Sequence, residues 1–328
     1  MTAARLRKHW PALLLLAIGV AAPYVVSANW VNVLISTLLF VFLCQAWNIV
    51  GGIAGQFSLA HSVFIAAGAY SSTLLYLDFG VSPWIGMLLG GVIAAVLGAG
   101  IAWLSFRYAL PPLSFALVTL ALAMLAFLTL SSVDLFGASA GLSLPMRGTP
   151  AMFHFRSDAA YYYIILAYVT VALGLSSWLY DAKPGLYFRT IRDNERAALA
   201  IGVPVLRYKM LAMSISAFLT ALAGTFYAQY MLYVEPRTFA GLNMTVQIIL
   251  FTVVGGSGTV WGPLLGPLLL VPLGETLRAA FGGESSALHL LVYGVLLVLV
   301  IRFSPGGLIG LIVRWRHAVF HVVEEGSR

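Results

Sequence analysis

The residues of this sequence that can hydrogen-bond in an apolar setting gather at two glycine-rich stretches. The candidates for lining or gating a solute path are Gly51, Gly55, Gln56, Ser58 and His61 at the first stretch, and Gln247, Gly255, Gly256 and Gly258 at the second. They include no nucleophile with a supporting base and no paired carboxylates, so no catalytic residues are predicted. Glycine also lets helices approach closely, and tight packing or a simple turn is the alternative.

The intramembrane amides and the lone histidine also have a structural interpretation. An interhelical hydrogen bond accounts for Gln45, Asn48 and Gln247 at least as well as contact with a solute does. His61 stands at a predicted helix end, where a histidine satisfied by its own protein is the commoner case.

Metal binding has little support in the sequence. Cys44 is the single cysteine, and one cysteine forms neither an internal disulfide nor a metal cluster. His317 and His321 are four residues apart near Glu324 and Glu325, a spacing that can hold a metal on a helix. A disordered, basic-then-acidic tail is favoured, and no metal site is predicted.

The elements that position these residues follow from composition. The chain has 328 residues, of which 61% are hydrophobic and 9% charged, whereas a soluble domain carries roughly 25% charged residues. This excludes an ordinary soluble protein and a disordered one. A membrane-crossing helix needs about 20 apolar residues, and the charge-free runs hold about ten. We therefore predict an all-α polytopic integral membrane protein with spans near 10–28, 30–50, 61–79, 83–106, 111–131, 160–180, 210–233, 242–256, 259–276 and 287–303.

The basic residues orient these spans. With the N-terminus inside, fourteen of the 18 Lys and Arg residues fall in inner segments, as short cytoplasmic loops require. We expect a cytoplasmic N-terminus at 1–9, a transmembrane domain at 10–303 and a cytoplasmic tail at 304–328. The 132–159 loop is expected outside and irregular, and the 181–209 loop inside. The net charge of +7 is explained by this bias and indicates no nucleic-acid partner.

The first apolar run has a second interpretation. Its basic start, apolar stretch and small residue at Ala28 are also typical of a cleaved signal peptide. Cleavage would leave nine spans. Retention is favoured, because the apolar stretch continues directly into the next span.

The inner loop contains a predicted surface helix. Pro184-Gly185 breaks the chain after the sixth span, and no Gly or Pro occurs from Leu186 to Ala200. Gly202 and Pro204 then predict a helix stop. The predicted apolar face is Phe188, Ile191, Ala198 and Leu199, and the predicted ion pairs are Arg189–Asp193 and Arg192–Glu195. Such a helix either rests on anionic lipid as a solvated loop or docks on a cytoplasmic partner.

Four stretches carry a family resemblance. The octet from Glu195 to Gly202 resembles the EAA loop of ABC-importer permeases, with Ala197 and Ala198 as the alanine pair. The stretches 51–61, 255–263 and 304–308 agree in order and spacing with the LivM-type permeases of branched-chain amino acid importers. The resemblance covers about residues 45–310. It departs from the family pattern at Ala60 and at 136–142.

The resemblance implies a division of labour in a bacterial cytoplasmic (inner) membrane. The permease forms the path, a second homologous permease pairs with it, two cytoplasmic ATPases dock on the EAA loops, and a periplasmic solute-binding protein delivers the solute. The ATPase-coupling residues would be Arg189, Arg192, Asp193, Glu195, Ala197, Ala198 and Gly202. The sequence has no G-x-x-x-x-G-K-[ST] motif, so ATP and Mg²⁺ are expected on the partner subunits and no cofactor on this chain.

Other functions stay open at this stage. Branched-chain amino acids are the first expectation for the solute, with urea or short amides as alternatives. A stand-alone secondary carrier of small neutral solutes would need no docking loop. An integral-membrane enzyme is disfavoured, because no catalytic cluster is present.

Overall fold

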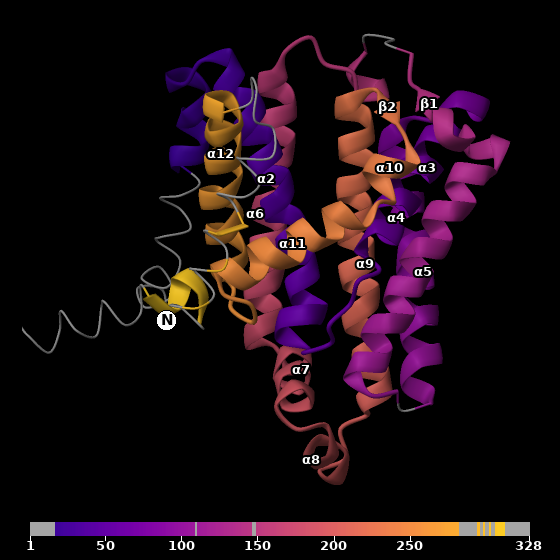
Figure 1. The fold of residues 1–328 in the computed structure, drawn as a ribbon, viewed down its shortest axis with the longest axis vertical. Helices are drawn as coiled ribbons and strands as arrows, with labels where there is room; N and C mark the ends of the chain where they lie inside the picture. Colours follow the sequence, from indigo (N-terminus) through magenta and orange to yellow (C-terminus); the bar gives the residue numbers. More distant parts are fainter. Residues whose placement is uncertain are drawn as a thin grey trace, which may run out of the picture.

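A computed structural model describes residues 17–108, 110–145, 149–281, 294–295, 298, 302 and 306–311. Within these residues the chain is a bundle of long helices that run largely along one axis (Figure 1). Residues 17–25 are helical, and the main helices after them are α2 (Ala28–Asn48), α3 (His61–Phe79), α4 (Pro83–Arg107), α5 (Pro112–Ser132), α6 (Asp158–Asp181), α7 (Lys183–Asp193), α8 (Glu195–Ala200), α9 (Val205–Met231), α10 (Pro236–Phe239), α11 (Leu242–Gly255) and α12 (Gly262–Phe281).

The helical polytopic class is confirmed. Six apolar segments among the described residues are long enough to cross a membrane: Ala28–Ile53, Pro83–Arg107, Pro112–Ser132, Asp158–Asp181, Val205–Met231 and Pro236–Gly255. A bilayer requires this solution, because a helix satisfies its own backbone hydrogen bonds. The helix α3 has the predicted bounds 61–79. Residues 1–16, most of the predicted span 287–303 and the tail from 312 lie outside the described residues.

The core of the bundle forms where α3, α4 and α9 pack against one another. Small residues set this close approach. A Cβ added at Gly68 of α3 would overlap the Ala221 carbonyl of α9, and one at Gly224 would overlap the Ile65 carbonyl. The Thr225 hydroxyl donates to the Gly68 carbonyl at 2.9 Å. These glycines therefore bring two backbones into direct contact.

The helix α2 is the centre of the second half of the bundle. It packs against α6, α9, α11 and α12, and 78% of its apolar window is buried. The helix α5 is the opposite case, with 22% buried. Its exposed side chains, such as Leu117, Leu125 and Leu128, form an apolar surface of the kind that faces lipid.

The helix α11 is too short to cross a bilayer alone. Its 14 residues span about 21 Å, against roughly 30 Å of hydrocarbon. Figure 1 shows it lying obliquely across the middle of the molecule, between α9 and the lower end of α12. Its C-terminal end therefore lies within the bundle.

The segment from Val133 to Ser157 is more ordered than predicted. It contains three 3₁₀ turns and a two-residue strand, β1 (Leu142–Ser143). That strand pairs antiparallel with β2 (Tyr233–Val234), matching Leu142 with Val234. Figure 1 places this sheet at the end of the bundle opposite α7 and α8.

The glycine contact between α3 and α9 predicts a matched pair of variants. Gly68→Ala should lower the free energy of unfolding by about 1–3 kcal/mol, because the new methyl group meets backbone that cannot yield. Gly100→Ala on α4 has open space around it, and helix propensity should raise its stability by up to about 1 kcal/mol. Thermal unfolding in detergent measures both, and equal midpoints would contradict the packing described.

Candidate functional site

The end of α2 is a π-helical turn. Ile49–Ile53 forms five residues of π-helix that carry both Gly51 and Gly52, a type of turn frequently found at functional sites. The Trp47 ring covers Gly51, where an added Cβ would overlap it, and the Trp47 indole N–H donates to the Ser58 carbonyl at 3.0 Å. Gly55 follows at φ 69°, a conformation that glycine adopts without strain.

The two glycine-rich stretches meet in space. The Asn48 amide nitrogen donates to the Thr259 carbonyl at 2.8 Å, and its amide oxygen accepts from the Gly258 N–H at 2.8 Å. A Cβ added at Gly52 would overlap the backbone nitrogen of Gly258. We call residues 48–55 together with 255–260 the glycine junction. The predicted spans 30–50 and 242–256 both end at the inner side in the predicted topology, but the sequence did not show that the two stretches touch.

The second stretch is held in shape by its own hydrogen bonds. Gln45 donates to the Val260 carbonyl at 2.9 Å. The Thr259 hydroxyl donates to the Gly256 carbonyl at 2.8 Å and accepts from the Gly262 N–H at 2.9 Å. Gln45 and Asn48 therefore have the predicted structural role, but their partners lie in the segment between α11 and α12 and not on a helix.

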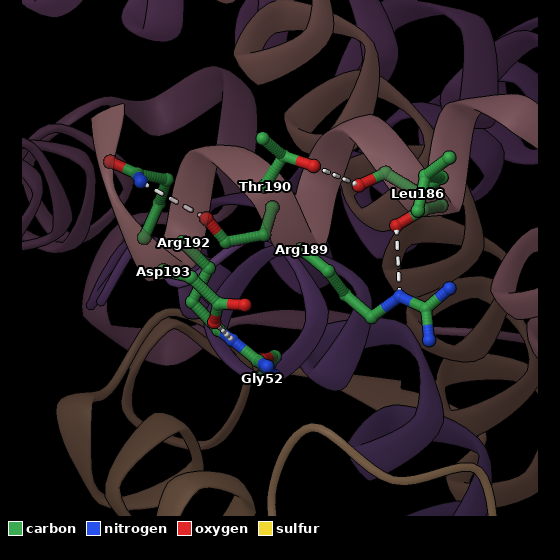
Figure 2. A network of polar contacts seen from close by, with 9 residues as sticks. Gly52, Leu186, Arg189, Thr190, Arg192 and Asp193 are labelled. Carbon is green, nitrogen blue, oxygen red and sulfur yellow. Dashed lines mark hydrogen bonds and ion pairs between the residues drawn. The ribbon is translucent and has the colours of Figure 1, made fainter. Parts of the chain in front are cut away.

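Arg192 of α7 reaches into this junction. Its Nη1 donates to the Gly52 carbonyl at 3.2 Å, and its Nε donates to Asp193 Oδ1 at 3.1 Å. An added Cβ at Gly258 would lie 2.7 Å from Arg192 Nη1, and one at Gly55 would overlap the Arg192 stem. Figure 2 shows Arg192 and Asp193 together beside Gly52, while Arg189 points away from them. The inner-loop helix and both glycine stretches thus share one side chain.

The predicted single helix over 186–200 is wrong. The structure has two helices, α7 and α8, with Asn194 in an extended conformation between them. The Asn194 side chain accepts from the Ala197 N–H at 3.0 Å, because asparagine is a strong helix N-cap and a weak residue inside a helix. The helix α7 also begins earlier than predicted, with Pro184 in its first turn, where proline is tolerated.

Both predicted ion pairs are also wrong. Arg192 pairs with Asp193, and Glu195 pairs with Lys209 at 2.7 Å. Arg189 turns back along α7, donates to the Tyr180 carbonyl at 3.1 Å and stacks over the Tyr180 ring. The break at Asn194 rotates Glu195 away from Arg192, so the spacing rule for a continuous helix no longer applies.

Lys209 is a functional candidate that sequence reasoning missed. Its side chain is 3% exposed, lies over the Phe106 ring at 4.3 Å and has Glu195 as its carboxylate partner. It joins α8 to the start of α9. A lysine at the end of the predicted 181–209 loop gave no sign of burial.

The surface of α7 and α8 is divided between a buried and an exposed side. Phe188, Ile191 and Ala198 are buried as predicted, but Leu199 is 56% exposed and Ile201 is 72% exposed. Glu195 and Ala197 are also exposed. Gly202 ends the segment at φ 82°. Exposed apolar residues at the tip of a charged helix suit contact with a partner.

Of the remaining path candidates, Gln56 borders the junction, while Ser58, His61 and Gln247 lie outside it. His61 is buried, and its Nε2 lies 2.9 Å from the Ser216 hydroxyl, which itself donates to the Ala46 carbonyl at 2.7 Å. Ser216 therefore accepts from His61, which fixes the proton on Nε2. The Gln56 side chain donates to the Ala54 carbonyl at 3.0 Å, and its backbone N–H donates to the Val50 carbonyl at 2.8 Å. Ser58 is buried, and Gln247 is exposed on α11.

Comparison with known proteins gives the family. The model for the branched-chain amino acid transport system permease component matches residues 29–301. The chain belongs to this family. It is 26% identical over 324 residues to the high-affinity branched-chain amino acid transport system permease protein LivM of Salmonella typhimurium and to that of Escherichia coli, covering 90% of this chain and 73% of each relative. It is also 27% identical to the ribose import permease protein RbsC of Bacillus subtilis over 48% of this chain and 51% of that protein.

No solved structure matches the chain. Family membership and the apolar helices identify a multi-pass membrane permease of the ABC type, whose relatives are transport subunits. The family setting implies ATPase and solute-binding partners. The EAA-like octet from Glu195 to Gly202 is therefore part of a permease.

The Asn48 bridge predicts a graded series. Asn48→Leu removes both hydrogen bonds to residues 258–259 and should cost about 1–3 kcal/mol per buried group left unpaired. Asn48→Asp keeps the acceptor for the Gly258 N–H and should lose less. Hydrogen exchange of the 255–260 amides measures the effect, and unchanged protection in Asn48→Leu would refute the bridge.

The buried lysine predicts a rescue. Glu195→Ala leaves the Lys209 ammonium without its carboxylate and should cost about 1–3 kcal/mol. Adding Lys209→Met should recover most of this loss, because no buried charge then remains. Asp193→Ala breaks an exposed pair and should cost under about 1 kcal/mol. Thermal unfolding compares the three variants, and a double variant no more stable than Glu195→Ala would exclude the pair.

Proposed function

We propose that this chain forms the membrane path of an ATP-driven importer of branched-chain amino acids in a bacterial cytoplasmic membrane. The names of the LivM relatives support this solute class. Neutral buried polar groups without partners among the described residues, such as the Gln229 amide, suit a zwitterionic or neutral solute better than a bare ion. The path needs no ionisable relay of the kind that marks proton-driven carriers.

One observation carries the coupling part of this proposal. The hydrogen bond from Arg192 to Gly52 ties α7 to the glycine junction, where α2 and α11 end. A displacement of α7 and α8 would therefore move the ends of α2 and α11 directly. Helices packed through glycines have no side chains to absorb such a shift, so it passes between backbones.

The docking face for the ATPase is the exposed side of α7 and α8. Leu199, Ile201 and Arg196 are exposed there, at the lower tip of the molecule in Figure 1. The buried side, with Phe188 and Ile191, keeps the segment attached to the bundle. An ATPase that closes on ATP would move this tip, with Arg192 as the link.

The assembly follows from family membership. We propose two ATPase subunits, which bind ATP and Mg²⁺, a second homologous permease and a periplasmic solute-binding protein. The distribution of basic residues supports a cytoplasmic location for α7, α8 and both chain termini. The 132–159 loop then faces the periplasm, where the binding protein docks.

Removing the Arg192 link predicts uncoupling. The full importer is purified with its ATPases and reconstituted in vesicles, and ATP hydrolysis and leucine uptake are measured together. Arg192→Ala should keep the ATPases bound and hydrolysing but lower uptake by tenfold or more, because the tip no longer holds Gly52. Arg192→Lys keeps the positive charge but has no guanidinium group, and its leucine uptake should lie between those of the wild type and Arg192→Ala.

Arg207→Ala is the matched control. Arg207 is exposed at the start of α9, and this variant should retain normal uptake per ATP. Full uptake by Arg192→Ala would eliminate the coupling role. Purification without ATPases, with solute movement that needs no ATP, would instead establish a stand-alone carrier. ATP-dependent uptake of urea or acetamide but not leucine would reassign the solute.

A further inference from the structure

A short segment seals the end of the bundle opposite α7 and α8. Residues 149–155, which we call the cap segment, receive hydrogen bonds from side chains of α6 and from the start of α4. The Ser82 hydroxyl donates to the Ala151 carbonyl at 2.6 Å, the Trp84 indole to Pro150 at 3.1 Å, and the Tyr161 hydroxyl to Phe153 at 3.2 Å. The cap segment is therefore a built element of the fold.

Phe153 anchors the cap segment in the bundle. It is fully buried and has φ 60°, a conformation that is rare for a bulky residue. Its ring lies 4.3 Å from the Trp84 ring and 6.1 Å from the Phe226 ring. Aromatic packing holds the residue in this conformation, which turns the next residue, His154, inward.

The buried side chains of His154 and Gln229 lack hydrogen-bond partners among the described residues. His154 is 3% exposed, and neither ring nitrogen has a hydrogen bond among the described residues. Gln229 of α9 is 0% exposed, and neither its amide nitrogen nor its amide oxygen has a partner there. Most buried polar side-chain atoms are paired in folded proteins, so two side chains with four unpaired atoms call for an explanation.

The contacts of His154 and of the neighbours of both residues put the two side chains at the same end of the bundle. The His154 ring is 6.1 Å from the Tyr76 ring of α3, and Phe226, which contacts Phe153, is one helical turn before Gln229. The cap segment therefore packs between the outer parts of α3 and α9. One turn inward from Tyr76, the buried Thr73 hydroxyl also has no partner among the described residues.

The chemistry of this group is neutral and amphipathic. Burial lowers the pKa of His154, so its ring is uncharged at neutral pH and presents one donor and one acceptor. Gln229 adds a donor and an acceptor. Phe153, Phe226 and Tyr76 supply aromatic surface beside these polar atoms.

We propose that His154, Gln229 and Thr73 form a solute-binding site beneath the cap segment, which takes a small zwitterion with an apolar side chain. The polar ends of the solute bind the amide, the imidazole and the hydroxyl, and its apolar part lies against the aromatic rings. The site rests on the proposed importer function and places one solute station on its path. The cap segment must open for the solute to enter.

Thiol labelling tests the site without relying on transport. Cys44 is the only cysteine, so Cys44→Ser gives a cysteine-free chain in which Gln229→Cys is introduced. The full importer in native membrane vesicles is treated with a water-soluble methanethiosulfonate, with or without leucine. Labelling that leucine slows by fivefold or more supports the site. Thr225→Cys, at a position one turn away that bonds Gly68, should label far more slowly.

Other labelling outcomes are equally decisive. No labelling at 229, or labelling unaffected by leucine, ribose and acetamide alike, would overturn the site. Protection by ribose or acetamide but not leucine would support the site and refute the amino-acid part of the proposed function. Solute protection in vesicles whose transport needs no ATP would support the site and refute the importer.

Stability and affinity together separate binding from packing. In the reconstituted importer, Gln229→Leu should raise the KM for leucine tenfold or more without lowering the Tm, because it removes an unpaired buried amide. Thr225→Val, which breaks a made hydrogen bond, should lower the Tm and leave the KM unchanged. A Gln229→Leu importer with a higher Tm and an unchanged KM would reduce the amide to a packing residue and overturn the proposal.

Discussion

The structure depends on backbone-to-backbone contact at positions where no side chain fits. Gly52 and Gly258 touch at the glycine junction. Between α3 and α9, Gly68 meets the backbone of Ala221 and Gly224 meets the backbone of Ile65. In a bilayer, helix association gains nothing from moving apolar side chains out of water, so close packing and interhelical hydrogen bonds must hold the bundle together. The glycines make that packing close enough for one arginine to reach across it.

Polar groups are treated differently at the two ends of the bundle. At the glycine junction, Asn48, Gln45 and Thr259 all find backbone partners. The Asn48 amide is paired at both its nitrogen and its oxygen, which stiffens the junction, since each lost hydrogen bond would leave a buried group unpaired. The Gln45 amide is paired at its nitrogen alone among the described residues. Beneath the cap segment, His154 and Gln229 are buried without partners among the described residues. A transporter needs both arrangements. A rigid unit such as the glycine junction transmits movement between helices, and a solute binds to polar groups that have no hydrogen-bond partner in the protein.

Much of the architecture was predictable because membrane insertion leaves a chain few choices. The absence of charges from long stretches predicted α3 to the residue and α4 to within one. The positions of both glycine stretches at helix ends also agreed with the structure. The prediction failed inside the 181–209 loop, where Asn194 divides one expected helix in two. There the local preference of an asparagine for capping overrode a face pattern that assumed one continuous helix.

By itself the sequence determined the class of protein, the approximate bounds of several long helices and the stretches with unusual backbone, because lipid imposes composition and length on every crossing segment. Tertiary structure alone decided which stretches meet. Arg192 donates to the Gly52 carbonyl and not to Glu195, and Glu195 pairs with Lys209. The turn at Asn194 sets the direction of these side chains. His154 becomes an interior residue for a similar reason: Phe153 and its aromatic neighbours fold a loop back into the bundle. These pairings join residues far apart in the chain, so they cannot be predicted from residue spacing within one helix.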